Sequence, residues 1–312
     1  MRAYARVACV AAGLALLAGC DFDDFGDFSR YHQDFHYTKP LNSGGRLSVR
    51  TLNGAVEIMA WEKNEVDISG TKYARSQDLL DATRIDVSGS SDAVTIRTEA
   101  PSGIHGGVGA RYSIRVPKSV VLDEITSSNG GIRVDETEGT AHLKTSNGGI
   151  HVDGLHGDLT AQTSNAGIDL QREEGNVEVH TSNGHVNAEV SGGTFLATTS
   201  NAGMQVRLTD PAADSPVKMD SSNGSLDLTL ETAKIPDIVM DTSNSSIHLG
   251  LPSSANADLH ASTSNSSIRC DFDVTVPGGV PSKKNRLDGH IGSGGPRIEL
   301  STSNGSVAIR KM

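Results

Sequence analysis

The chain has 312 residues, of which 36% are hydrophobic and 4% aromatic, and its formal net charge at pH 7 is −11. An acidic surface of this kind repels nucleic acid and anionic lipid headgroups, which excludes the nucleic-acid-binding classes of protein. The modest apolar fraction predicts a narrow hydrophobic core.

The first 19 residues have the features of an export signal. Arg2 and Arg6 precede an uncharged apolar stretch of 12 residues, 7–18. A membrane-spanning helix needs about 20 apolar residues, so this stretch indicates a secretory signal peptide. It ends in Leu-Ala-Gly-Cys, which resembles the bacterial lipobox. We therefore expect residues 1–19 to be a lipoprotein signal peptide and Cys20 to carry two or three acyl chains that hold the mature protein to a membrane.

The residue after the acylated cysteine bears on sorting. Asp21 resembles the signal for inner-membrane retention in enterobacterial lipoproteins, so we expect the periplasmic face of the inner membrane rather than the outer membrane. Cleavage would remove two arginines and no acidic residue, which makes the mature charge −13. Only the lipid is then expected to touch the membrane. Cys270 would be the sole remaining thiol, so no intrachain disulfide is predicted.

Two segments precede the regular repeats. Residues 20–41 comprise the acylated cysteine and an acidic, aromatic stretch without a clear period, which favours a solvated tether over a partner-binding segment. Residues 42–125 alternate apolar and polar side chains in short runs, such as Val56-Glu57-Ile58, and predict a β-rich N-terminal portion of the body. Within it, Ser76 to Thr83 predicts one short helix with Ser76 as its N-cap.

An internal repeat dominates residues 126–312. Its marker is Ser-Asn after Thr or Ser, followed by small residues and an apolar one. The first five copies are spaced by 18 residues. The marker asparagines are Asn129, Asn147, Asn165, Asn183, Asn201, Asn223, Asn244, Asn265 and Asn304.

Stacking the sequence at this period gives columns of constant character. Ile132, Ile150 and Ile168 share an apolar column, a polar column that includes His151 follows, and a second apolar column comes next. Apolar, polar, apolar is a half-buried strand. A second such strand follows a glycine column half a repeat later. The predicted fold is all-β, a β-solenoid with about 18–21 residues per coil, in which coils bury their apolar faces by stacking.

The Ser-Asn corner has a proposed structural role. Asn tolerates the left-handed backbone conformation, so we expect the marker asparagines to adopt it and to stack as an amide ladder. The threonines two residues earlier, such as Thr163, would form a hydroxyl ladder beside it. The wider interval before Asn304 predicts one repeat plus a polar loop between Pro277 and Asn285.

These motifs carry a family resemblance. The copies Ser128-Asn129-Gly130-Gly131-Ile132 and Ser303-Asn304-Gly305-Ser306-Val307 resemble those of bacterial putative adhesins with β-strand repeats, a family of unassigned function. The resemblance covers roughly residues 42–312. It implies a fold and transfers no catalytic or binding residue.

No catalytic, metal or cofactor site is predicted. The outward column that contains His151 mixes charges without a repeated acidic pair, which disfavours a glycoside-cleaving enzyme. Neutral corners make poor calcium cages, and scarce aromatic residues disfavour sugar stacking. Cys270 aligns with the inward position of Val152 and is expected to be a buried, inert thiol.

The leading functional hypothesis is a non-enzymatic, lipid-anchored β-solenoid that presents a binding or scaffolding surface in the cell envelope. Its partners would be the membrane, through the lipid on Cys20, and an envelope protein or surface polymer of unknown identity. The alternatives are an accessory to envelope-stress sensing and a carbohydrate-active β-helix enzyme. Crosslinking in cells would separate the binding or scaffolding role from the stress-sensing role, and turnover of a polysaccharide would support the enzyme.

Overall fold

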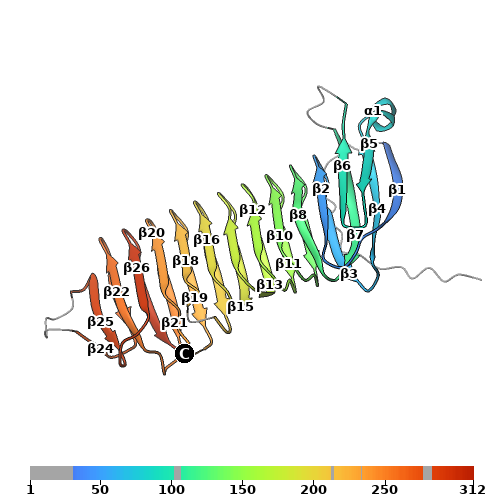
Figure 1. Cartoon of the computed structure of the whole chain (residues 1–312). Helices are drawn as coiled ribbons and strands as arrows, with labels where there is room; N and C mark the ends of the chain where they lie inside the picture. Colours follow the sequence, from blue (N-terminus) through green and yellow to red (C-terminus); the bar gives the residue numbers. More distant parts are fainter. Residues whose placement is uncertain (1–30, 102–106, 212–213, 233, 277–282) are drawn as a thin grey trace, which may run out of the picture.

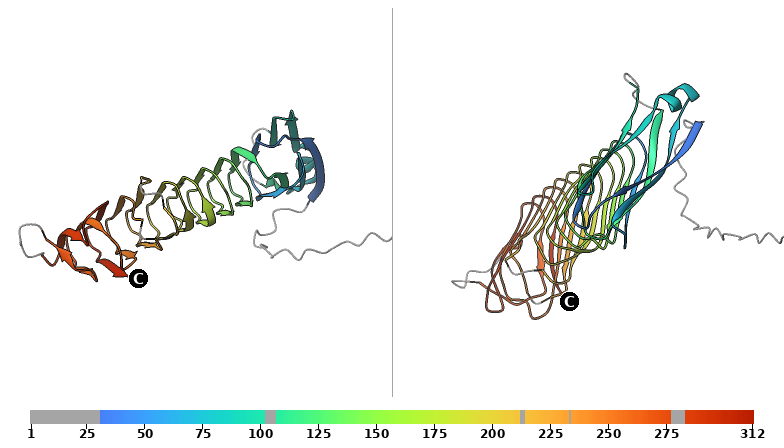
Figure 2. Two further views of the ribbon diagram at one scale, coloured as in Figure 1. Left: turned by 60° about the horizontal axis from the view of Figure 1, so that its bottom comes forward. Right: turned by 45° about the vertical axis from the view of Figure 1, so that its right-hand side comes forward.

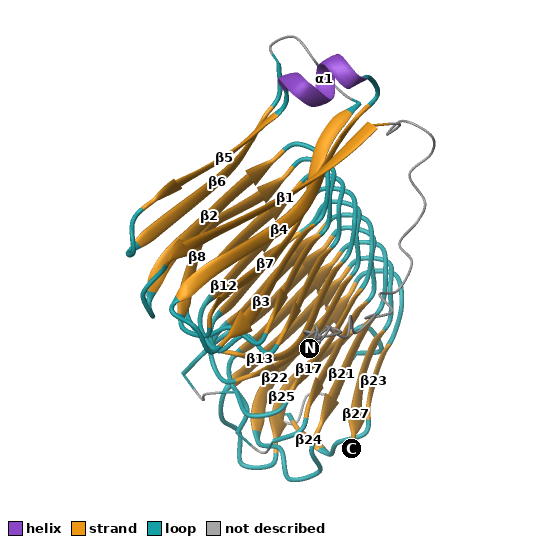
Figure 3. Ribbon diagram, turned by 90° about the vertical axis from the view of Figure 1, so that its right-hand side faces the viewer, coloured by secondary structure: helices purple, strands orange, loops and turns teal. Residues whose placement is uncertain are grey.

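The computed structural model describes residues 31–312 except 102–106, 212–213, 233 and 277–282. Two long sheets, of 13 and 14 strands, run the length of an elongated body and face each other across a narrow core (Figure 1). The view along the body shows one coil behind the next (Figure 3). The predicted all-β solenoid-like fold is therefore confirmed.

Each regular coil contributes one strand to each sheet. The first sheet receives β9 (Ile132–Asp135), β11 (Ile150–Asp153), β13 (Ile168–Glu174), β15 (Val186–Ser191), β17 (Met204–Leu208), β19 (Leu226–Leu230) and β21 (Ile247–Leu251). The second receives β8 (Val120–Ser127), β10 (Ala141–Thr145), β12 (Leu159–Gln162), β14 (Val177–His180), β16 (Phe195–Thr199), β18 (Val217–Ser221) and β20 (Ile238–Thr242). Neighbouring strands within this stretch are parallel.

The predicted register is confirmed. Ile150 pairs with Ile132 on one side and Ile168 on the other, and all three side chains are at most 2% exposed. The adjacent His151 points outward and is partly exposed. Because every coil repeats the same inward positions, the core is a stack of apolar ladders that extends from one end of the body to the other.

An excursion of the chain caps the N-terminal end. β2 (Gly45–Thr51) and β3 (Val56–Trp61) form a coil directly beside β8 and β9, although some 60 residues separate them in sequence. The intervening chain forms β4 (Glu65–Ala74), α1 (Gln77–Ala82), β5 (Arg84–Gly89), β6 (Ala93–Glu99) and β7 (Val108–Pro117). These elements lie beyond that first coil (Figure 1). The predicted helix is confirmed, and the hydroxyl of Ser76 accepts a hydrogen bond from the Leu79 amide at 3.4 Å.

The outermost strand of the first sheet comes from a segment that the sequence assigned to the tether. Residues 31–40 form β1 (Tyr31–Pro40), which pairs antiparallel with β4 over its whole length. The tether expectation is therefore wrong for this part. Its residues show no clear period because both faces of β1 are largely exposed.

The C-terminal end departs from sequence order as well. β22 (Ala257–Thr263) and β23 (Ile268–Cys270) continue the chain after β21, with β24 (Val274–Thr275) and β25 (Arg286–Ile291) beyond them. The last coil, β26 (Arg297–Thr302) and β27 (Val307–Lys311), then inserts between the β20–β21 coil and the β22–β23 coil. Figure 2 shows this end from two further sides. Most of the predicted loop between Pro277 and Asn285, residues 277–282, lies outside the described part of the chain, and the change in the order of the coils was not predicted.

Among the described residues, no helix is long and apolar enough to span a bilayer. Residues 1–19, Cys20 and Asp21 lie outside the described part of the chain.

Candidate functional site

The marker asparagines form one continuous row of side-chain hydrogen bonds along the body. Asn165 Nδ2 donates to Asn147 Oδ1 at 2.6 Å, and Asn183 Nδ2 donates to Asn165 Oδ1 at 2.9 Å. The row begins at Asn53 and follows the coils in their spatial order. It passes through Asn129, Asn147, Asn165, Asn183, Asn201, Asn223, Asn244, Asn304 and Asn265. The row therefore fixes the spacing of the coils along an exposed corner.

The backbone of this corner differs from the expectation. None of the marker asparagines has a positive φ, so the predicted left-handed conformation is wrong. Positive φ values occur at the opposite corner, in the glycine column, where Gly157 has φ +152° and Gly175 has φ +139°. A Cβ on Gly175 would lie 2.3 Å from the Gly157 carbonyl oxygen. Glycine is required there because it alone tolerates both this φ and this approach.

The Thr or Ser before each Ser-Asn pair bonds to the backbone at the Asn corner. Thr145 Oγ1 accepts a hydrogen bond from the Gly148 amide at 3.3 Å and donates to the Gly130 carbonyl of the preceding coil at 2.9 Å. Thr163 likewise donates to the Gly148 carbonyl. The threonine hydroxyls of the predicted ladder are buried, and each donates to a backbone carbonyl of the preceding coil.

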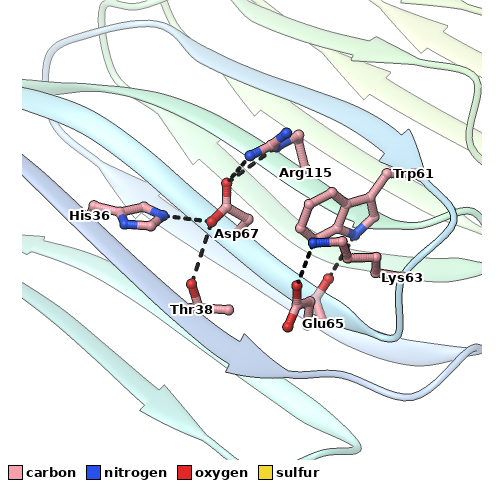
Figure 4. Close-up of polar contacts among 7 residues, drawn as sticks. All are labelled: His36, Thr38, Trp61, Lys63, Glu65, Asp67 and Arg115. Carbon is pink, nitrogen blue, oxygen red and sulfur yellow. Dashed lines mark hydrogen bonds and ion pairs between the residues drawn. The ribbon is translucent and has the colours of Figure 1, made fainter. Parts of the chain in front are cut away.

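A second polar group lies on the outer face of the N-terminal cap, on β1, β3, β4 and β7. We call it the cap cluster: His36, Trp61, Lys63, Asp67 and Arg115 (Figure 4). Asp67 lies at its centre and is 7% exposed. Its Oδ1 lies 2.6 Å from His36 Nε2, and its Oδ2 accepts from Arg115 Nη2 at 2.6 Å and from Arg115 Nε at 3.2 Å.

These contacts set the charge of the carboxylate. Burial raises the pKa of Asp67, but hydrogen bonds from Arg115 and His36 and the charges of both groups together lower it by more. The pKa of Asp67 therefore lies below its ordinary value. Asp67 is therefore an anion at neutral pH with both oxygens engaged. It fixes the orientation of the Arg115 guanidinium and the His36 ring, which are both more than half exposed at their side chains.

The indole of Trp61 holds two cations in the same cluster. The Arg115 guanidinium carbon lies 4.6 Å from the ring centroid, and Lys63 Nζ lies 4.7 Å from it, both within the range of cation–π attraction. Trp61 Nε1 donates to the Glu65 carbonyl at 2.9 Å, which fixes the ring. The cluster thus presents three cationic or basic groups to solvent around a fixed anion and a fixed aromatic ring.

A buried acid lies on the glycine side of the coil. Glu173 is 1% exposed, and neither of its carboxylate oxygens has a hydrogen-bond partner among the described residues. It follows Arg172, whose φ is +55°, at a bulge in the pairing of β13 with β15. Desolvation raises the pKa of Glu173 to about 8, although the Leu155 backbone lowers it in part.

Two remaining sequence assignments concern thiols and metals. Cys270 pairs in register with the buried Ile309, as the inward assignment requires, but it is only half-buried because β23 is the edge strand of the first sheet. Burial raises the pKa of its thiol. Among the described residues, no group of three or more His, Cys, Asp or Glu side chains is arranged to hold a metal ion.

Sequence reasoning did not find the cap cluster. Alternation places Asp67 and Arg115 outward, because each stands between two apolar residues of a strand. Their meeting depends on the antiparallel pairing of β4 with β7, in which Asp67 faces Arg115, and on β1, which brings His36. No periodic signal in the sequence announces either pairing.

One family model matches the β body, and three solved structures are similar to the chain. A family model described as Toastrack DUF4097 matches residues 45–310. A putative adhesin from Bacteroides fragilis is 13% identical, with a TM-score of 0.42, and the match covers 91% of this chain and 98% of that one. A putative cell adhesion protein from Clostridium sporogenes is 11% identical, with a TM-score of 0.25, over 90% and 100% of the two chains. A putative lipid binding protein from Parabacteroides distasonis is 12% identical, with a TM-score of 0.34, over 90% and 98%. No curated protein matches the chain.

Proposed function

We propose that this chain, which belongs to the Toastrack DUF4097 family, is a non-enzymatic binding and scaffolding protein of the cell envelope that is held to a membrane by lipid on Cys20. The observation that carries the proposal is the cap cluster. It lies at the end of the body that is nearest in sequence to Cys20, on the strand that begins at Tyr31 and on the strands beside it.

The chemistry of the cluster supports binding. Arg115, His36 and Lys63 keep side-chain exposures of 52%, 62% and 65%, while Asp67 and Trp61 hold them in place. Fixed, solvated cations bind carboxylate or phosphate groups with little loss of side-chain entropy. The ligand class that fits is therefore an acidic group on an envelope polymer or protein.

The same geometry argues against acid–base catalysis at this site. A general acid or base needs a pKa near the working pH and a free position toward substrate. Asp67 has a lowered pKa and both oxygens engaged. Glu173, whose pKa is raised to about 8, is buried in the core and has no access to a substrate.

The anchor is tested by fractionation. The wild-type chain is expected in the membrane fraction, and the Cys20→Ser variant is expected to leave it. A Cys20→Ser chain that stays with the membrane in high salt would contradict lipid anchoring.

The binding role is tested by crosslinking in intact cells followed by mass spectrometry of the captured material. Arg115→Ala is expected to reduce capture at least fivefold, whereas Arg133→Ala, an outward arginine on the same sheet that pairs with Asp135, should not. Equal capture by both variants would refute the role of the cluster. Turnover of a polysaccharide by the wild-type chain would refute the non-enzymatic assignment.

A further inference from the structure

Among the described strands, four are edge strands of the two sheets, and they differ greatly in length. The edge strands β23 and β24 have 3 and 2 residues, and β5 has 6. β1 has 10 residues and pairs with β4 at every position, without a bulge. Proteins usually protect edges by keeping them short, bulged or interrupted by proline. β1 has proline only at its last position, Pro40, and its other edge pairs with no described strand.

The inward face of β1 is also incompletely covered. Tyr31 and Tyr37 are 41% and 38% exposed, which places them among the most exposed large apolar side chains of the described chain. They stand on the same side of the strand as Phe35, which packs partly on the core. A groove of about 490 Å³ lies between this face and the segment that joins α1 to β5, lined by residues that include Phe35, Tyr37 and Ile85.

From these features we propose that β1 is a dimerisation edge, where β1 of a second copy adds antiparallel and continues the first sheet across a two-fold axis at Phe35. Antiparallel pairing of identical strands opposes each residue with one fixed partner position. An axis at Phe35 keeps the inward faces of both copies on one side. An axis between two residues would turn the core face of the second copy to solvent.

Charge and strand length together favour this register, because an axis at Gln33 would also oppose Asp34 with a histidine, His32, but would pair only residues 31–35 of β1. With the axis at Phe35, Asp34 opposes the partner's His36, and Tyr31 opposes the partner's Lys39; each pair occurs twice. An axis at Asp34 would oppose two carboxylates, and an axis at His36 would oppose two imidazoles, which disfavours both. The ring of His36 contacts Asp67 through Nε2, so a protonated ring can donate from Nδ1 to the partner's Asp34 at the same time.

The proposal rests on β1 and does not require the lipid; it shares His36 with the cap cluster and leaves Arg115 and Lys63 unused. Pairing would leave the outward face of the first sheet free, because the added strand lies at its edge. Two copies anchored in one membrane would raise the effective concentration of the edge, which favours pairing.

The register is tested by a disulfide that only the mixed dimer can form. Two full-length variants with different tags, Gln33→Cys and Tyr37→Cys, each with Cys270→Ser, are produced alone and together in cells and oxidised mildly. In the proposed register, residue 33 opposes residue 37 of the second copy, at a Cβ separation of about 5 Å. A crosslinked mixed dimer is expected from co-production, with at least tenfold less product from either variant alone.

The control places a matched pair of cysteines on β5, the second-longest edge strand among the described residues. Ser88→Cys and Asp86→Cys on β5 should give no mixed dimer. Sedimentation of the Cys20→Ser chain provides a second measurement, in which wild-type β1 should dimerise and Asp34→Arg should weaken dimerisation at least tenfold. Folded variants that give no mixed crosslink, a product from Gln33→Cys alone, or crosslinking to a different protein would each overturn the proposal.

Discussion

Glu173 gives the sharpest test of the energetics of the coil. Its pKa of about 8 in the folded chain exceeds the ordinary value of 4.5, so between these pH values the folded state binds more protons than the unfolded state. Stability must therefore fall as pH rises through this window. At 1.36 kcal/mol per pKa unit, the stability lost at pH 7 relative to the fully protonated protein is about 3 kcal/mol, and the loss between pH 5 and pH 8 is about 3.5 kcal/mol.

The perturbation is Glu173→Gln, which keeps the shape of the side chain and removes its charge. Denaturant midpoints measured by circular dichroism from pH 5 to pH 8 should fall steeply with pH for the wild type and much less for the variant, so that Gln is the more stable at pH 8. Glu178→Gln, at an exposed position on β14, is the matched control and should keep the wild-type slope. If Glu173→Gln keeps the wild-type dependence of the midpoint on pH, Glu173 does not have the raised pKa that its burial predicts.

The remaining predictions concern the register and the two corners. Ile150→Asp should lower the denaturant midpoint strongly, because it places an unpaired charge in the core at a cost of several kcal/mol, whereas His151→Asp should be nearly silent; equal midpoints would refute the register. Asn165→Ala should lose about 1 to 2 kcal/mol with its two ladder bonds, and Asn165→Gly should be slightly worse because the φ there is negative; Gly as stable as Asn would contradict the corner as observed. Gly175→Ala should lower the free energy of unfolding by about 2 kcal/mol or more, because the added Cβ meets the Gly157 carbonyl; an unchanged free energy of unfolding would show that the coil spacing relaxes freely.

The repeat made the body of the fold predictable. Every coil places Ile150 and its equivalents at one inward position, so a period in the sequence maps directly onto a ladder in space. The backbone at the corners was not predictable in this way. Asn165 and Gly175 both suit a turn by residue type, and residue type alone does not reveal that φ is negative at the asparagine and positive at the glycine.

The two ends of the body could be predicted least. Their strands pair over long sequence separations, as Asp67 with Arg115 and Asp258 with His290 illustrate, and such pairs carry no period. The cap cluster depends on these pairings, and so its residues were visible in the sequence only as outward positions.

The placement of β26 and β27 bears on how the chain acquires its structure. The β20–β21 coil and the β22–β23 coil are neighbours in sequence, yet they are separated in space by β26 and β27, which come later in the chain than either coil. Every earlier regular coil docks directly on its predecessor, so a chain that ends before Arg297 would dock β22 on β20 instead. The native order of the coils thus cannot form before β26 and β27 are available, and a chain cut before Arg297 would lack the two strands that keep the β20–β21 coil and the β22–β23 coil apart.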